Sequence, residues 1–390
     1  MISQLGGAVL FLALFVVLCA IAITVAIRAR NMQIWLGSYL RRRRPTLPLA
    51  EPIHVMFCFV DHFEPAWGKV DLATQRARVD RWCQDYRALT AGHRDADGRP
   101  PQHTFFYPEE EYVEEHLTKL AALCADGYGE IEIHLHHDND TADNFKTTIS
   151  NFNELLHTRH GALPRDPVSG QLRFGFIHGN WSLDNSRGDG RWCGINNELI
   201  LLRELGCYAD FTLPSAPSDT QTRIINAIYY ATDDPLRPKS HNSGVPVRVG
   251  GEASGDLMIV QGPLGLNWRQ RKFGLIPRIE NADVRRGCPP TPERVDAWVR
   301  TGIHVEGRPE WVFVKVHTHG TQERDMDTLL GAPADAMHAH LESAYNDGRN
   351  YVLHYVTARE VYNIIKAAEA GRTGNPDTYR DYLLPPPGGA

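Results

Sequence analysis

The sequence predicts an α/β fold in which a largely parallel β-sheet is covered by helices and preceded by one transmembrane helix. Between residues 53 and 372, short apolar runs alternate with amphipathic segments. This alternation is typical of parallel sheets, which are either doubly wound or closed as a barrel. An uncharged apolar segment lies near the N-terminus. Polar side chains directly follow several of the apolar runs, where parallel strands commonly build binding sites at their carboxyl ends.

The apolar segment at residues 7–27 carries no charged side chain. As a helix it would extend about 30 Å, which is the thickness of the hydrocarbon core of a bilayer. It lacks the basic residues and the shorter apolar core of a cleaved signal peptide. We therefore expect residues 1–27 to be an uncleaved membrane anchor.

Basic residues follow this anchor and none precedes it. Arg28 and Arg30 come directly after it, and residues 41–44 are four consecutive arginines. The positive-inside rule then favours a single-pass protein of the cell (inner) membrane with a cytoplasmic domain, an extracytoplasmic domain being the alternative. Apolar residues within 32–40 predict a short interfacial helix, with arginines near anionic head groups. Residues 28–52 thus form a basic juxtamembrane segment that ends in the linker PTLPLAEP.

The globular domain is expected to begin with a strand at 54–60, a continuous apolar run typical of a strand buried on both faces. Further strands are expected around 131–133 and at 103–106, 172–177, 208–213, 311–316 and 351–355. Helices are expected at 73–90, 111–125, 142–158, 194–205, 292–301, 334–346 and 358–370.

The alternation is interrupted at residues 214–290, which are rich in Pro, Gly and Ser. Within this insertion, the alternating valines at 245–249 and the apolar run at 257–260 predict a β-hairpin. Residues 373–390 end in LLPPPGGA and are expected to be disordered.

Composition narrows the class of protein. A net charge of -6 and a charged fraction of 23% are ordinary for an enzyme and give no sign of a nucleic-acid-binding surface. The seven cysteines are scattered without C-x-x-C spacing. They are therefore expected to be thiols in a reducing compartment, not a disulfide framework or a zinc ribbon.

The stretch GEIEIHLHHDND at residues 129–140 carries the densest set of candidate metal ligands. It begins as a strand and then places three histidines and two aspartates within seven residues. Imidazole and carboxylate together suit zinc, cobalt, nickel or iron. His136 and Asp140 are spaced by four, which favours convergence on one ion, although His134 or His137 could replace His136.

Other polar side chains also gather where strands are expected to end. They are Asp61 with His62, His178 with Asn180 and Trp181, Asp210, and His317 with His319. In α/β barrels this edge of the sheet carries the active site. Together these positions predict a metal-dependent active site.

Three segments, FVDHFEP, EIHLHHDND and VKVHTHG, resemble motifs of the polysaccharide deacetylases of the NodB-homology type, also called carbohydrate esterase family four. The resemblance covers roughly residues 53–360 in order and rests on short motifs. It implies a distorted (β/α)7 barrel that holds one divalent metal.

The resemblance also implies roles for single residues. Asp61 matches the general base of the family, and His62 occupies the position of its aspartate ligand. His136 matches the first histidine ligand of the family, and Asp140 falls on the second. Aspartate and histidine are thus exchanged while two nitrogens and one carboxylate are kept.

The last family motif places His317 as the general acid. His178 and Asn180 would support the site, and His319 shares the face of His317. Tryptophans in loops, Trp67, Trp181 and Trp268, could stack on a sugar.

These roles imply a membrane-anchored deacetylase that removes an N- or O-acyl group from a polysaccharide or a lipid-linked saccharide. A metal-activated water, deprotonated by Asp61, would attack the carbonyl, and His317 would protonate the leaving group. One ion is expected, zinc first, with cobalt, nickel or iron as alternatives.

Two other functions remain open from the sequence. A glycoside hydrolase could use Asp61 or Glu64 as nucleophile, with a second carboxylate about 5 to 9 Å away. A non-catalytic membrane protein could bind metal on the same scaffold, since the ligand positions depart from the family pattern.

Overall fold

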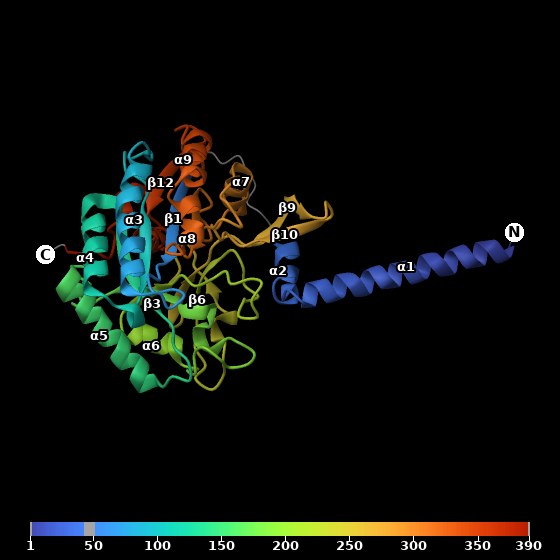
Figure 1. Ribbon diagram of the computed structural model, residues 1–390, viewed down its shortest axis with the longest axis horizontal. Coiled ribbons are helices and arrows are strands. Elements are labelled where there is room, and N and C mark those ends of the chain that lie inside the picture. The colour runs from blue at the N-terminus through green and yellow to red at the C-terminus, as the bar shows by residue number, and fades with distance from the viewer. Residues whose placement is uncertain (1, 43–50, 389–390) are drawn as a thin grey trace.

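The computed structural model describes residues 2–42 and 51–388, and it combines an α/β body with one long projecting helix (Figure 1). That helix, α1 (Ile2–Arg28), is long and apolar enough to cross a membrane. Residues 43–50, which include Arg43 and Arg44 of the basic run and most of the linker, lie outside the described residues.

The juxtamembrane segment forms a 3-10 turn, η1 (Met32–Ile34), and a short helix, α2 (Leu36–Arg41). The expected short helix is therefore present. Between them, Trp35 is fully buried and packs with Ala216, Ile225 and Leu264 of the body. This apolar contact fixes the segment that follows α1 onto the globular domain.

The main sheet has ten strands and is mostly parallel. The parallel strands are β1 (Ile53–His62), β2 (His103–Pro108), β3 (Gly129–Leu135), β4 (Phe174–His178), β5 (Cys207–Asp210), β8 (Leu257–Val260), β11 (Trp311–Thr318) and β12 (Tyr351–Val356). Two further strands, β6 (Ile228–Ala231) and β7 (Val245–Pro246), are antiparallel. The order is β11-β1-β2-β3-β4-β5-β8-β6-β7.

β1 pairs with three other strands and is almost wholly buried, as its continuous apolar run predicts. It pairs with β11 along most of its length. On its other side it pairs first with β12 and then, over its last four residues, with β2. Its carboxyl end therefore lies among several strand ends, which is where the candidate site forms.

Strand pairing among the described residues does not join β11 to the other end of the sheet. The Lys315 side chain on β11 nevertheless donates to the backbone carbonyls of Phe211 and Leu213, just beyond β5, so these two parts of the sheet approach each other. The structure thus shows a mixed α/β fold with a large, mostly parallel sheet.

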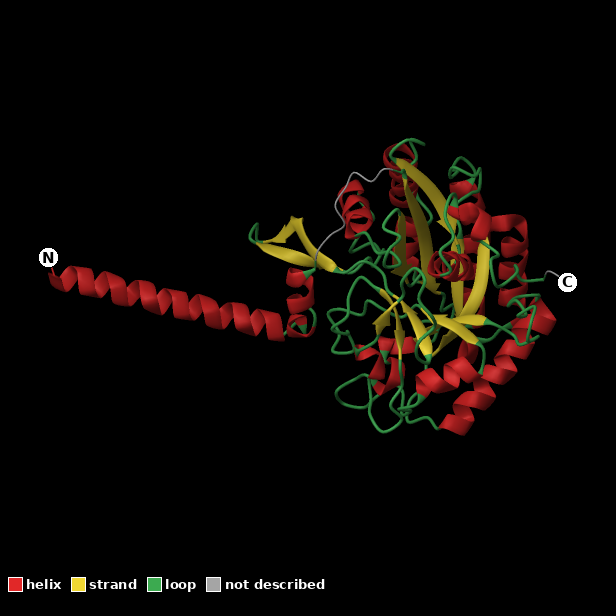
Figure 2. Cartoon of the chain, turned by 180° about the vertical axis from the view of Figure 1, so that it is seen from behind, coloured by secondary structure: helices red, strands yellow, loops and turns green. Residues whose placement is uncertain are grey.

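Helices lie around the outside of the strands (Figure 2). They are α3 (Leu72–Thr90), α4 (Glu114–Leu123), α5 (Ala142–His160), α6 (Glu198–Glu204), α7 (Pro292–Thr301), α8 (Glu323–Leu329), α9 (Ala332–Tyr345) and α10 (Ala358–Glu369). Capping side chains fix the N-terminal ends of some of these helices. At the start of α3 the Asp71 side chain accepts from Thr74 N, and at the start of α10 Thr357 forms a capping box with Glu360.

The hairpin expected from 245–249 and 257–260 is wrong. β7 and β8 both pair with β6, on its two sides, and not with each other. The insertion does contain a hairpin, but it is formed by β9 (Gly265–Lys272) and β10 (Ile276–Glu280), a separate two-stranded sheet. Alternating valines indicate a strand, whereas its partner is chosen by packing with distant residues.

The expected disorder of the C-terminal tail is also wrong for residues 373–388. The tail contains the turn η7 (Pro376–Tyr379), and Arg380 and Leu384 are 2% and 1% exposed. Arg380 Nη1 donates to Tyr355 O at 2.6 Å and to Glu360 Oε2 at 2.9 Å. The proline- and glycine-rich end suggested disorder, but these long-range partners hold it against the body.

Candidate functional site

The carboxyl ends of β1, β3 and β11 bring five metal-type ligands together. His62 ends β1 and Glu64 follows two residues later. His134 and His136 lie at the end of β3, and His319 follows β11. Two overlapping groups, His62 with Glu64 and His319, and Glu64 with His134 and His136, each hold their candidate ligand atoms within 4.8 Å of one another. We call these five residues the His–Glu cluster.

Glu64 is the residue that the two groups share. Its Oε1 lies 3.2 Å from His134 Nε2 and 3.4 Å from His136 Nε2. The His62 ring is stacked on His319, with 4.5 Å between ring centroids. One carboxylate oxygen therefore faces two imidazole nitrogens at the separation that ligands of a single ion have, about 3 to 4 Å.

Neighbouring groups fix the orientation of both β3 histidines. His134 Nδ1 lies 2.9 Å from the Ile177 carbonyl oxygen, which can only accept, so Nδ1 carries the proton and Nε2 is free to ligate. His136 Nδ1 contacts Glu110 Oε1. Backbone carbonyls and carboxylates in this position orient metal-binding imidazoles in many proteins.

The charges of the cluster are strongly coupled. Burial opposes ionisation of Glu64, but the neighbouring imidazoles of His134, His136 and His319 outweigh it and hold the Glu64 pKa well below its usual range. Burial likewise opposes a charge on His136, yet Glu110 and Glu64 raise the pKa of His136 to about 10. Burial and neighbouring histidines lower the pKa of His62 well below its usual range. His136 thus carries the positive charge that a metal ion would replace.

This donor set fits a divalent metal ion. Two imidazoles and one carboxylate with open positions suit zinc, iron, cobalt or nickel better than calcium or magnesium, which prefer oxygen ligands. His62 and His319 add two more nitrogens on the other side of Glu64. The residues of the cluster could therefore hold a metal ion while leaving room for a substrate.

A cavity of about 330 Å³ opens onto the cluster. His62, Glu64, His136 and His319 line it on one side. The other lining residues include Trp67, Glu111, Asn180, Trp181 and Gln322. A neighbouring cavity of about 490 Å³ shares Trp67, Trp181 and His319 with the first and is also lined by His317. Aromatic rings thus border a polar site large enough for a small substrate.

Of the predicted ligands, His62 and His136 belong to this cluster, but Asp140 does not. Its Oδ2 lies 3.2 Å from His137 Nδ1, and its Oδ1 accepts from Thr141 N and Asn144 Nδ2. Adjacent residues at the end of a strand point to opposite sides, so His137 and Asp140 lie on the other side from His136. Glu64 supplies the carboxylate instead.

Asp61, the predicted base, is fully buried. Its Oδ1 accepts from Gly320 N at 2.6 Å, and its Oδ2 lies 2.9 Å from His103 Nε2. A Cβ at position 320 would lie 2.0 Å from Asp61 Oδ2, so only glycine allows this approach. Both carboxylate oxygens already have partners within the protein, and the role of Asp61 as a base stays a prediction.

The other predicted residues divide between two places. His319 and Trp181 lie at the cluster, where the Trp181 ring is 5.9 Å from His62 and 5.6 Å from His319. Asn180 and Trp181 have φ values of 56° and 57°, a conformation that is rare without a local constraint. His178 instead joins His137 in a second group with Cys193 and Glu198.

Sequence reasoning missed Glu64 and Glu110 as parts of the metal site. Glu64 had a signal, since it is a carboxylate three residues after Asp61 at the end of a buried strand. No sequence signal marked Cys193 or Glu198 as a ligand. Cys193 lies in a loop and Glu198 begins a helix, and both are far along the chain from His137.

No family model matches this chain, and no curated protein matches it. Function is therefore inferred from the site itself.

Proposed function

We propose that the protein is a membrane-anchored, metal-dependent hydrolase that removes an acyl group from the amide or ester of a carbohydrate. Zinc, cobalt, nickel or iron would be held by Glu64, His134 and His136, with His62 and His319 beside them. The observation that carries this proposal is the approach of Glu64 Oε1 to both Nε2 atoms, at 3.2 and 3.4 Å.

A bound divalent metal would acidify a water molecule and polarise the carbonyl to be cleaved. Glu110 holds His136 in position, and Trp67 and Trp181 border the space for a sugar ring. His319 lines both cavities, so we assign it the proton given to the leaving group. Burial and Lys315 hold the pKa of His317 well below its usual range, which makes a neutral His317 a poorer acid than the resemblance implies.

The resemblance to polysaccharide deacetylases is part of this proposal. Ligands at the ends of β1 and β3 and polar residues after β11 lie in the order that the family implies. A (β/α)7-like barrel would require β11 to approach the region after β5. The contacts from Lys315 to the carbonyls of Phe211 and Leu213 support that approach.

The full chain, purified in detergent, tests the proposal through its metal content and its hydrolysis of acetylated amino sugars. We expect a chelator to remove activity and added zinc or cobalt to restore it. Glu64→Gln should lose the metal of this cluster, whereas Glu109→Gln, a change in the turn beside Glu110, should not. Full hydrolysis by the chelated protein would contradict the proposal.

A glycoside hydrolase is the second candidate, and one observation favours it. Glu64 and Glu111 line the same cavity, and their pKa values are moved in opposite directions. The pKa of Glu64 is held well below its usual range by neighbouring histidines, whereas burial raises the pKa of Glu111 to about 7. Such a pair suits a nucleophile and an acid. Cleavage of glycosides that survives chelation but is lost in Glu111→Gln would establish this alternative.

A further inference from the structure

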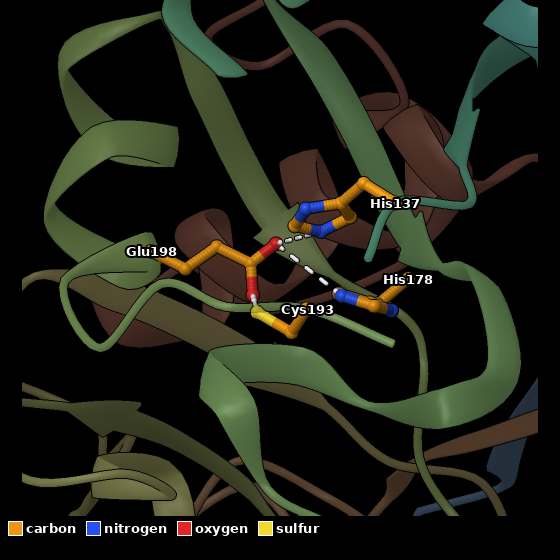
Figure 3. Close-up of side chains that lie close together, drawn as sticks. All are labelled: His137, His178, Cys193 and Glu198. Carbon is orange, nitrogen blue, oxygen red and sulfur yellow. Dashed lines mark hydrogen bonds and ion pairs between the residues drawn. The ribbon is translucent and has the colours of Figure 1, made fainter. Parts of the chain in front are cut away.

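A second set of metal-type ligands lies apart from the His–Glu cluster. His137, His178, Cys193 and Glu198 bring their candidate ligand atoms within 4.8 Å of one another (Figure 3). His178, Cys193 and Glu198 are fully buried, and the His137 side chain is 6% exposed. The four come from the ends of β3 and β4, a loop, and the first residue of α6. We call them the His–Cys–Glu cluster.

The distances within this cluster match the size of a coordination sphere. Glu198 Oε1 lies 3.2 Å from His137 Nε2 and 3.6 Å from His178 Nε2. Cys193 Sγ lies 3.5 Å from Glu198 Oε2. Tetrahedral zinc with bonds of about 2.0 to 2.3 Å places its ligands about 3.3 to 3.8 Å apart.

His178 supplies an independent reason to expect a cation here. Its Nδ1 contacts the Gly179 carbonyl oxygen, which can only accept, so Nδ1 carries the proton. Nε2 then presents a lone pair, has no hydrogen-bond partner and faces the Glu198 carboxylate. A buried lone pair facing a buried carboxylate is unfavourable, and a metal ion between them would give His178 Nε2 the partner that it lacks.

The backbone around the cluster holds the cysteine loop in place. Trp192 N donates to Asp138 Oδ1 at 2.6 Å, and Asp140 N donates to Cys193 O at 2.9 Å. Gly194 has a φ of 106°, and a Cβ there would lie 2.5 Å from Asp140 N. Asp140 Oδ2 also contacts His137 Nδ1 at 3.2 Å, as carboxylates beside metal-binding histidines do.

We propose that His137, His178, Cys193 and Glu198 form a closed, structural metal site of the zinc type, separate from the His–Glu cluster. Four protein ligands fill a tetrahedral sphere and leave no position for substrate, which is the pattern of structural zinc. The bound ion would tie the segment that carries His136 to the turn that carries Trp181, and so shape the neighbouring cavity.

Cobalt(II) distinguishes the two clusters, because only the His–Cys–Glu cluster includes a thiol among the groups identified in the described residues. We expect the full chain in detergent, loaded with Co(II) alone, to show thiolate-to-cobalt charge-transfer absorption. Cys193→Ala should abolish this absorption. Cys207→Ala, a matched change at another buried cysteine, should retain it.

Glu64→Gln should lower the cobalt content by about one ion per chain and leave the thiolate absorption unchanged, so the two proposals can fail separately. The wild-type spectrum does not depend on whether any variant folds. Wild-type protein that binds Co(II) without thiolate absorption would overturn the proposal. Absorption that survives Cys193→Ala would overturn it as well.

A separate observation concerns the hairpin of β9 and β10. It exposes four large apolar side chains, with Phe273 and Leu275 at 91% and 79% and Trp268 and Ile276 at 53% and 48%. Basic residues lie among them, namely Arg269, Arg271 and Lys272. Apolar side chains interleaved with basic ones are typical of segments that lie in a membrane interface.

The hairpin is fixed beside the membrane-proximal part of the chain. Its residues Leu266 and Ile279 pack in the same apolar cluster as Tyr39 of α2. Both views show the hairpin projecting from the side of the body from which α1 extends (Figures 1 and 2). With α1 in a bilayer, the hairpin tip would therefore face the lipid head groups at the end of α1.

We propose that this hairpin inserts its tip into an anionic bilayer surface as a second membrane contact. Full-length protein in nanodiscs of phosphatidylglycerol and brominated phosphatidylcholine provides the test. Phe273→Trp should add tryptophan emission that the brominated lipid quenches. Val168→Trp, a control on an equally exposed loop after α5, should add emission that is not quenched. Equal quenching of the two added tryptophans would overturn the proposal.

Discussion

Glu110 controls His136 from outside the set of metal ligands. Its carboxylate contacts His136 Nδ1, while His136 Nε2 faces Glu64. The negative charge would make the imidazole a stronger ligand and would leave Nε2 as the nitrogen that faces a bound metal. In the proposed site, Glu110 would therefore position His136 and would not bind the metal itself.

Glu110→Gln should lower metal affinity about 10- to 100-fold, because an amide neither carries the charge nor fixes the ring as well. Competition with a chelating dye measures the affinity of the full chain. Glu109→Gln is the matched control and should change the affinity little, since Glu109 belongs to the same turn but the hydrogen bonds of His136 go to Glu110. Equal losses in the two variants would show that Glu110 acts only through the net charge.

Asp61→Asn separates a catalytic from a structural role. If Asp61 is the base, turnover should fall about 10²- to 10⁴-fold while metal content stays at the wild-type level. Its contacts with Gly320 and His103 predict a structural cost as well, measured as a lower melting temperature. A lower melting temperature with unchanged turnover would assign Asp61 to the scaffold, and loss of metal would make it part of the metal site.

At the level of single elements, β3 and the residues directly after it supply candidate ligands to both clusters. His134 and His136 reach one cluster and His137 reaches the other, since side chains alternate along an extended chain. The same strand also holds Glu132 in its buried part, where its carboxylate accepts from Tyr208 Oη and Gly175 N. Burial raises the pKa of Glu132 to about 8.

This raised pKa predicts a pH dependence of stability. Between 4.5, the ordinary pKa of a glutamate side chain, and the folded value of about 8, Glu132 keeps a proton in the folded state that it loses on unfolding. The free energy of unfolding should therefore fall as pH rises through this window, by at most about 1.4 kcal/mol per pH unit. Chemical denaturation of Glu132→Gln should give a flatter profile, and parallel profiles for variant and wild type would contradict the assignment.

At the scale of the whole molecule, the C-terminal tail closes one end of the body. The Arg380 guanidinium is buried among Glu360, the Tyr355 carbonyl and Asp95, which lies 285 positions away in the sequence. Removing one partner from such a buried network leaves unpaired charges, which is costly.

Arg380→Ala should lower the free energy of unfolding by about 3 to 5 kcal/mol. Arg372→Ala is the control, because Arg372 is exposed and its side chain contacts Tyr382 at the surface, so the change should stay within about 0.5 kcal/mol. Denaturation of the full chain measures both. Similar small effects would mean that the tail adds little stability.

A further prediction for the whole molecule concerns the side of the membrane on which the globular body lies. Arg28 ends α1, and Arg30, Arg41 and Arg42 follow it, which favours a cytoplasmic body and a lipid-linked saccharide as substrate. A reporter fused to the C-terminus decides this: alkaline phosphatase should be inactive there and a fluorescent protein should fluoresce. Active phosphatase would place the body outside and favour a secreted polysaccharide.

Features that depend on local pattern can be predicted from the sequence. The apolar helix α1, the alternation of strands and helices and the polar residues at the ends of β1, β3 and β11 all follow from side-chain periodicity and hydropathy. Local pattern was therefore enough to predict His62 and His136 as ligands, and both lie in the His–Glu cluster.

Which of these residues contact one another depends on the packing of the whole chain. Glu64 and His134 are 70 positions apart, and His137 and Glu198 are 61 apart, so neither pairing leaves a trace in local periodicity. The contacts of the buried C-terminal tail and the pairing of β8 with β6 likewise leave no trace in local periodicity. Local patterns fix the direction in which a side chain points from its element, but its partners depend on how whole elements pack, which is a property of the complete chain.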